Sequence, residues 1–147
     1  MANREYPDCP RVGIGTVVIR DGRVILVKRG CAPSEGLWAI PGGMHELGET
    51  IQEAAEREML EETGVTVRAG DPVYAFDFFE RDADGRIRFH FVIVDVAADY
   101  VSGQPKGADD AMEARWFSPE EIDEYPVAKN TIRLLAAIGF LRDNRNA

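Results

Sequence analysis

Residues 43–65 read GMHELGETIQEAAEREMLEETGV, and this stretch decides how the rest of the chain is interpreted. Thr50 followed by Glu53 is the capping-box pattern that begins a helix, and Gly64 suits the left-handed residue that ends one. We therefore expect a helix over residues 51–63, with a glycine-containing loop before it.

Three glutamates, Glu58, Glu61 and Glu62, lie within an arc of about 100° on this helix, because successive residues turn by about 100°. One interpretation is an ordinary solvated face, since Glu is a good helix former. The glutamates share that side with apolar residues such as Met59, however, and like charges near a packed face are costly unless a cation compensates them. Backbone N–H groups at the start of the helix also suit phosphate oxygens. The pattern favours a site for a divalent cation and a phosphate compound.

The spacing of these residues resembles the Nudix box. Gly43 is followed after five residues by Glu49, and after seven more by REMLEETGV at residues 57–65, which matches every defined position of the box. A chance match of this kind is expected on the order of once in ten million chains of average composition. The resemblance implies a hydrolase that cleaves the diphosphate of a nucleoside diphosphate derivative, with Mg²⁺ as cofactor and Mn²⁺ as a possible substitute.

The resemblance also implies roles for the charged residues of the box. Glu58 and Glu62 correspond to metal ligands, with Glu61 as a third. A ligand set made only of oxygen suits a hard cation that keeps several waters and shares phosphate oxygens with the substrate. Arg57 resembles the residue that orients the carboxylates during catalysis, and Glu49 is its expected partner.

The general base that activates the attacking water is not defined by the box. Glu62 is one candidate. The other lies before Trp116, where several relatives carry a catalytic glutamate, and here that position is Glu113 or the nearby Asp109 and Asp110. An ordinary strand-edge glutamate is an equally good interpretation of Glu113.

Substrate contacts are expected on both sides of the box. The Gly43 carbonyl is a further implied metal ligand, and the backbone of Gly42 and Gly43 is expected to approach the substrate. Arg29 ends a predicted strand beside the site, where it suits a phosphate, although a plain surface charge is the alternative. Trp38 is placed to stack on a base or to belong to the core.

The segments around the box predict an α+β domain in which a mixed β-sheet is sandwiched between helices, the α/β/α arrangement of the Nudix fold. We expect a lead-in over residues 1–11, one domain over 12–142 and a short tail over 143–147. A short helix is expected to begin at Ser118 and a final helix to cover about 127–142. Strands are expected at 12–20, 24–28, 37–40, 66–68, 73–80, 86–96 and 114–117.

Charge and hydropathy limit the partners. The net charge of −9 argues against nucleic acid as a partner. An acidic protein that handles a polyanion needs local positive charge, which bound cations would supply. No apolar run approaches the roughly 18 residues of a membrane span, and the N-terminus shows no secretory signal, so we expect a cytoplasmic protein with no membrane partner. The family resemblance allows a homodimer.

Segments outside the box resemble one bacterial ADP-ribose pyrophosphatase subgroup within the family. On that resemblance the expected reaction is ADP-ribose plus water giving AMP and ribose 5-phosphate. The main alternative is a MutT-like pyrophosphohydrolase of nucleoside triphosphates, including oxidised ones, and the alternative of another class is a nucleotide-sensing module without turnover. The resembling segments are Lys28-Arg29-Gly30, Gly36-Leu37-Trp38, Arg88-Phe89-His90-Phe91, Asp109-Asp110-Ala111 and Ala114-Arg115-Trp116-Phe117.

Overall fold

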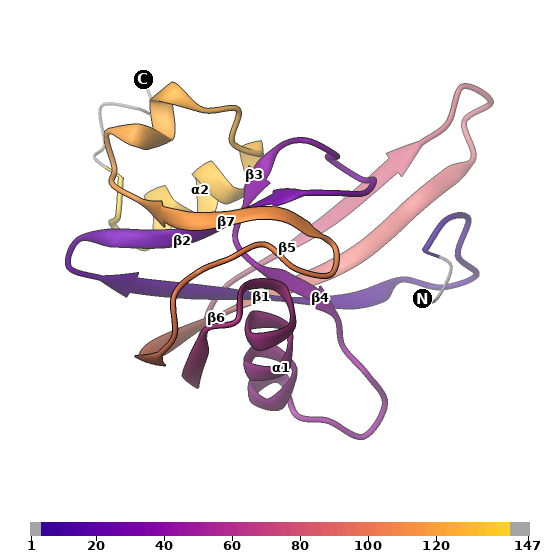
Figure 1. The fold of residues 1–147 in the computed structure, drawn as a ribbon. Helices are drawn as coiled ribbons and strands as arrows, with labels where there is room; N and C mark the ends of the chain where they lie inside the picture. The colour runs from indigo at the N-terminus through magenta and orange to yellow at the C-terminus, as the bar shows by residue number, and fades with distance from the viewer. Residues whose placement is uncertain (1–3, 142–147) are drawn as a thin grey trace.

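A computed structural model describes residues 4–141 as a strand-rich domain with two α-helices (Figure 1). None of the helices in this part of the chain is long and apolar enough to cross a lipid bilayer. The elements are β1 Arg11–Arg20, β2 Arg23–Arg29, β3 Trp38–Ala39, β4 Gly42–Met44, α1 Ile51–Thr63, β5 Thr66–Arg81, β6 Ile87–Ser102, β7 Ala111–Phe117, the 3₁₀-helix Glu121–Glu124 and α2 Lys129–Ala137.

Strand β1 organises the mixed sheet. It pairs parallel with β6, and antiparallel with β2 near its C-terminal end and with β4 near its N-terminal end. The sheet continues through β6 to β5 on one side and through β2 to β3 on the other, with β7 also paired to β2. The expected mixed sheet is therefore confirmed, and the parallel pairing joins strands that are far apart in the sequence.

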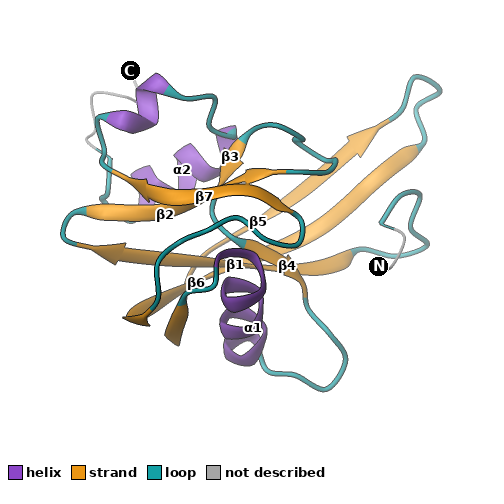
Figure 2. Ribbon diagram, viewed as in Figure 1, coloured by secondary structure: helices purple, strands orange, loops and turns teal. Residues whose placement is uncertain are grey.

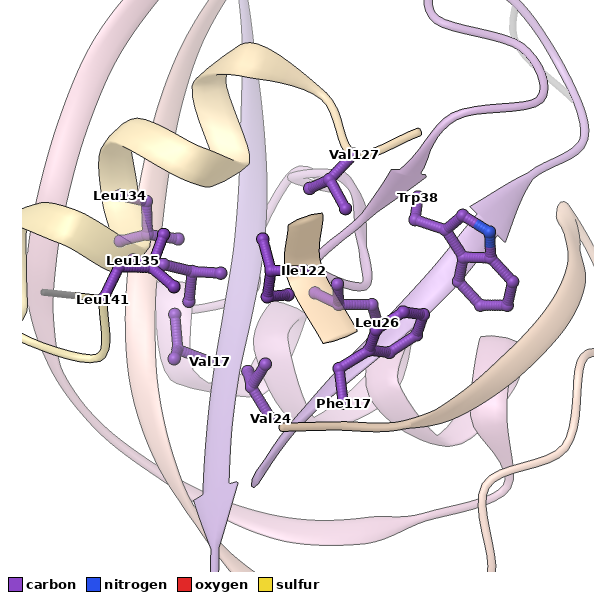
Figure 3. Close-up of a cluster of buried hydrophobic side chains, with 10 residues drawn as sticks. All are labelled: Val17, Val24, Leu26, Trp38, Phe117, Ile122, Val127, Leu134, Leu135 and Leu141. Atoms are coloured by element: carbon purple, nitrogen blue, oxygen red, sulfur yellow. The ribbon is translucent and has the colours of Figure 1, made fainter. Parts of the chain in front are cut away.

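The two α-helices cover opposite faces of β1 (Figure 2). Side chains alternate along a strand. Ile14 packs in one cluster with the start of α1, and Val18 in another with Met59. Val17 points the other way and packs with Leu134 of α2 (Figure 3). Helices on both faces confirm the α/β/α sandwich expected from the sequence.

Helix α1 begins and ends where the sequence predicts. Thr50 Oγ1 accepts a hydrogen bond from the Glu53 N–H at 3.0 Å, and Glu53 Oε1 accepts one from the Thr50 N–H at 3.1 Å. Gly64 ends the helix with φ 75°. Both caps are local interactions, which explains why the sequence alone predicts the bounds of this helix.

Several strands differ from the expectation because pairing between strands extends them. The expected strands 66–68 and 73–80 form one strand, β5, with irregular pairing between Ala69 and Tyr74. Strand β6 continues to Ser102, beyond the expected end at 96. The strand expected over 37–40 is replaced by two short strands, β3 and β4. Strand β4 begins at Gly42 and pairs with β1. The two strands lie so close that a Cβ at Gly42 would overlap the Ile14 carbonyl.

The C-terminal helices are shorter than expected. The helix expected over 127–142 covers Lys129–Ala137, because Val127 forms a β-bridge with Trp38 and Gly139 adopts φ 83°. Residue 142, the expected end, lies outside the described residues. The helix expected from Ser118 is a single 3₁₀ stretch, Glu121–Glu124, although Ser118 N–H does donate to Glu121 Oε1 at 3.0 Å.

Candidate active site

Two glutamates of α1 are held against β4. Glu62 is 5% exposed, and its Oε1 accepts a hydrogen bond from the Gly42 N–H at 2.8 Å. The Glu58 carboxylate lies against Gly43, where a Cβ would overlap it. Gly43 is therefore required by the close approach of helix α1, and Gly42 by the close approach of β1. Together they let the two carboxylates lie against one strand.

Arg57 connects the acidic groups around this place. Its guanidinium binds Glu49 through two hydrogen bonds of 2.7 and 3.1 Å, and it donates to Glu58 at 2.8 Å and to Glu61 at 3.3 Å. It also donates to the Met44 carbonyl at 3.1 Å. The hydrogen bonds from Arg57 lower the pKa of Glu49, and the fork geometry fixes the orientation of the guanidinium.

The buried carboxylates have shifted pKa values. Burial raises the pKa of Glu62 to about 8, and the charges of Glu58 and Asp110 act in the same direction. Burial also raises the pKa of Glu58, while the Arg57 guanidinium opposes that shift. Two carboxylates that are shielded from water repel each other and destabilise the folded state, and a cation bound between them would offset this effect.

The donor set fits a hard divalent cation in one respect and not in another. Glu58 and Glu62 offer only oxygen, and Mg²⁺ is commonly held by one or two carboxylates together with waters and substrate phosphates. Among residues 4–141, however, no three His, Cys, Asp or Glu side chains converge as a ready-made ligand cluster. The third glutamate, Glu61, does not converge with the other two, because its side chain is 44% exposed and turned toward Arg57. The site provides two carboxylate ligands, and other oxygens would fill the remaining coordination positions of a cation.

Arg29 lies beside the carboxylates. Its pKa is lowered by burial, and the charge of Glu62 partly offsets that effect. Its Nε donates to the Pro33 carbonyl at 2.7 Å, which holds the side chain at the mouth of a cavity. Asp110 acts on both Arg29 and Glu62 electrostatically, and forms an ion pair with Arg4 at 3.4 Å. A cation held between these acidic groups is well placed for a phosphate.

The loop before β7 contributes Asp110 rather than Glu113. The Glu113 side chain is 61% exposed and pairs with Lys28 across β2 and β7 at 3.8 Å. This arrangement agrees with the interpretation of Glu113 as a strand-edge glutamate. Asp109 is exposed in a turn with φ 54°, whereas Asp110 raises the pKa of Glu62.

Trp38 belongs to the core and does not line the cavity, which corrects the substrate contact considered for it. The residue is 4% exposed, and its ring meets Phe117 edge-on with centroids 4.9 Å apart (Figure 3). Leu26 and Val127 belong to the same cluster. The bridge between β3 and Val127 turns the indole inward, so it stabilises the packing under α2.

A cavity adjoins the carboxylates. It lies on the α2 side of the sheet, and Gly42 and Gly43 line it while also contacting Glu62 and Glu58. Two aromatic residues of β5, Phe76 and Phe78, also line it. The other lining residues include Arg4, Gly13, Gly15, Arg29, Phe91, Ile93, Asp95, Asn130, Thr131 and Leu134.

Two charged residues of this cavity were not singled out from the sequence. Arg4 was assigned to the lead-in, and no local pattern indicates that the lead-in folds back against Asp110. Asp95 had a signal, since it interrupts the apolar run FVIVDVAA in β6. Acidic residues are rarely buried inside a strand, so this position indicates a functional role.

The fold and the site define a class: small α+β domains with a glycine-flanked acidic helix for phosphate chemistry. A family model described as the NUDIX domain matches residues 10–138, and the chain belongs to the Nudix family.

Relatives within the family carry several activities in their names. An ADP-ribose pyrophosphatase of Methanocaldococcus jannaschii is 34% identical over 108 residues, covering 74% of this chain, and the match spans 62% of that relative's length. A CTP pyrophosphohydrolase of Escherichia coli is 33% identical over 135 residues, covering 91% of this chain and 95% of the relative.

Solved structures agree with the fold. A MutT Nudix hydrolase from Burkholderia pseudomallei superposes with a TM-score of 0.76 at 31% identity, covering 89% of this chain and 99% of that one. A bifunctional NMN adenylyltransferase/ADP ribose pyrophosphatase from Francisella tularensis, complexed with AMP and a Mn ion, superposes with a TM-score of 0.68 at 25% identity. That match covers 88% of this chain and 41% of the neighbour.

Proposed function

We propose that this protein is a Mg²⁺-dependent pyrophosphohydrolase that converts ADP-ribose and water to AMP and ribose 5-phosphate. One water adds across the P–O–P anhydride, one phosphorus–oxygen bond forms and one breaks. The observation that carries the proposal is a pair of carboxylates, the half-buried Glu58 and the buried Glu62, held against Gly43 and Gly42 of a cavity that Phe76 and Phe78 also line.

Each residue of the site then has a role. Glu58 and Glu62 would hold the metal, with the Gly43 carbonyl as a further ligand. Glu61 would join them when Arg57 releases its side chain. When bound, Mg²⁺ supplies positive charge that stabilises the phosphates as the anhydride breaks. Arg57 and Glu49 position the two carboxylates and do not themselves touch the substrate.

The proton of the attacking water needs an acceptor near neutral pH. Glu62 is one candidate because it lies beside the proposed metal site. Burial raises its pKa to about 8 in the metal-free protein, and a bound cation would lower that pKa and keep the carboxylate charged. Asp110 is the second candidate, since it is the acidic group of the β7 loop that acts on Glu62. Arg29 faces the mouth of the cavity and is assigned to a substrate phosphate.

ADP-ribose is favoured because the Methanocaldococcus jannaschii relative is named for that activity and the Francisella tularensis neighbour was solved with AMP and manganese. A nucleoside triphosphate is the second candidate, because the Escherichia coli relative that spans nearly the whole chain is named for CTP. A cytoplasmic location and a homodimer stay predictions.

The test is a substrate panel with separated products. The protein is incubated with ADP-ribose, other nucleoside diphosphate derivatives and nucleoside triphosphates, each with Mg²⁺, with Mn²⁺ and with a chelator. We expect AMP and ribose 5-phosphate from ADP-ribose with either metal and no product with the chelator. Pyrophosphate release from triphosphates without turnover of ADP-ribose would establish the second candidate. Binding of nucleotides without turnover of any compound would indicate a sensing module.

A further inference from the structure

Asp95 lies inside the cavity without a protein partner for one of its oxygens. In β6, Phe91, Ile93 and Asp95 share one face, and all three line the cavity. Asp95 is 1% exposed, and none of residues 4–141 donates a hydrogen bond to its Oδ2. Its Oδ1 occupies the space where a side chain at Gly15 would begin.

This position is unfavourable unless a ligand completes it. A buried carboxyl group that lacks a donor destabilises the folded state, and an apolar β-branched residue would suit the strand better. Burial alone raises the pKa of Asp95 to about 7. By contrast, Glu58 and Glu62 receive hydrogen bonds from Arg57 and Gly42. A molecule that enters the cavity can supply the donor that Asp95 lacks.

The residues that line the cavity indicate which part of that molecule lies near Asp95. Gly42 and Gly43 contact Glu62 and Glu58, and the diphosphate is assigned beside them and Arg29. Phe76 and Phe78 contribute aromatic rings to the cavity walls, and such rings suit a flat heterocycle. Asp95 is in register with Gly15, whose missing side chain leaves room beside the carboxyl group.

We propose that Asp95 is a specificity residue that accepts a hydrogen bond from the 6-amino group of adenine. This inference rests on the proposed function, because it assumes that the nucleoside enters the cavity with its phosphates at the carboxylates. Hypoxanthine carries an oxygen at the same position and would direct an acceptor toward the carboxylate. A site built around one hydrogen bond rejects such an analogue because its buried polar group is left unpaired.

The test compares two bases in the same enzyme at pH 8. We measure kcat/KM for ADP-ribose and for its analogue with hypoxanthine, in the wild type and in Asp95→Asn. The wild type should prefer adenine by about tenfold or more. In Asp95→Asn the ratio should fall toward one, because the amide both accepts from an amino group and donates to a carbonyl oxygen. Asp99→Asn, an exposed site on the same strand, is the matched control and should keep the wild-type ratio.

A binding measurement separates this inference from the proposed reaction. The affinities of AMP and IMP are measured by calorimetry in the wild type, Asp95→Asn and Asp99→Asn, with Mg²⁺ and without any turnover. If ADP-ribose is not hydrolysed, the reaction proposal fails while the preference for AMP over IMP still tests Asp95. Equal affinity of the wild type for AMP and IMP would overturn the inference. An equal loss for both bases in Asp95→Asn, with the ratio unchanged, would assign Asp95 a purely structural role.

Discussion

Carboxyl groups with raised pKa values lie at two places along the cavity, yet their surroundings differ. We call these places the mouth, where Gly42 and Gly43 of the cavity lining meet Glu62 and Glu58, and the inner wall around Asp95. At the mouth, Glu58 and Glu62 are close enough to repel each other and are held by Arg57 and Gly42. At the inner wall, Asp95 stands alone with an unpaired oxygen. A pair of like charges calls for a cation, whereas a single unpaired acceptor calls for a hydrogen-bond donor. Buried carboxyl groups in one protein can therefore indicate opposite kinds of ligand.

The largest expected effect is at the mouth. Glu62→Gln keeps the shape of the side chain and removes the charge that holds the metal and accepts the proton. We expect kcat to fall by about 10²–10⁴-fold in the presence of Mg²⁺. Glu53→Gln is the matched control on the same helix, because Gln still completes the capping box. Unchanged turnover in Glu62→Gln would refute the assignment of this carboxylate.

Arg57 is expected to show a smaller effect of a different kind. Arg57→Lys keeps the positive charge but loses the two-point contact with Glu49. We expect an activity loss of about 10–100-fold and a higher Mg²⁺ concentration for half-maximal activity. Glu49→Gln should have a similar effect, and the double variant should lose less than the product of the two. An unshifted Mg²⁺ requirement would show that Arg57 does not position the metal ligands.

The inner wall should control how stability depends on pH. Burial raises the pKa of Asp95 from 3.8 to about 7, so the folded state binds a proton more tightly than the unfolded state. The resulting stabilisation is complete below pH about 4 and is lost as the pH rises to about 7. Asp95→Asn removes this loss, and its stability relative to the wild type should increase over that range by up to about 4 kcal/mol, because each unit of pKa shift corresponds to about 1.4 kcal/mol. Denaturant unfolding with a chelator at several pH values measures it.

If the free energy of unfolding changed with pH in the same way in the wild type and in Asp95→Asn, between pH about 4 and about 7, the burial of an unpaired carboxyl group at this position would be contradicted. Asp99→Asn serves as the control again, because its exposed carboxylate should not change the pH dependence.

The smallest effect is expected at Glu113. Its side chain is exposed and paired with Lys28, and an exposed ion pair of this kind contributes at most about 1 kcal/mol. Glu113→Gln should leave kcat within about twofold, since an exposed pair is worth so little, whereas Asp110→Asn should lower kcat more strongly. The reverse order, measured under saturating Mg²⁺, would make Glu113 the general base in place of the groups at the mouth.

Much of the mouth could be predicted from the sequence because its structure is local. The capping box at Thr50, the left-handed Gly64 and the spacing of Glu58 and Glu62 all involve residues within a few turns of one helix. The same reasoning predicted the contact between Arg57 and Glu49 through the resemblance to the family box. It did not predict that Glu61 would remain exposed, because exposure depends on where the loop before α1 lies.

By itself, the sequence determined the acidic helix with its caps, the mixed α+β arrangement and the family. Only the tertiary structure decided that Trp38 is buried, that Glu113 points outward and that Arg4 returns to Asp110. Only the parallel pairing of β1 with β6 decided that Asp95 faces the cavity beside Gly15. The physical reason is range: caps and helical spacing act between near neighbours, whereas a cavity wall depends on the register of strands far apart in the chain.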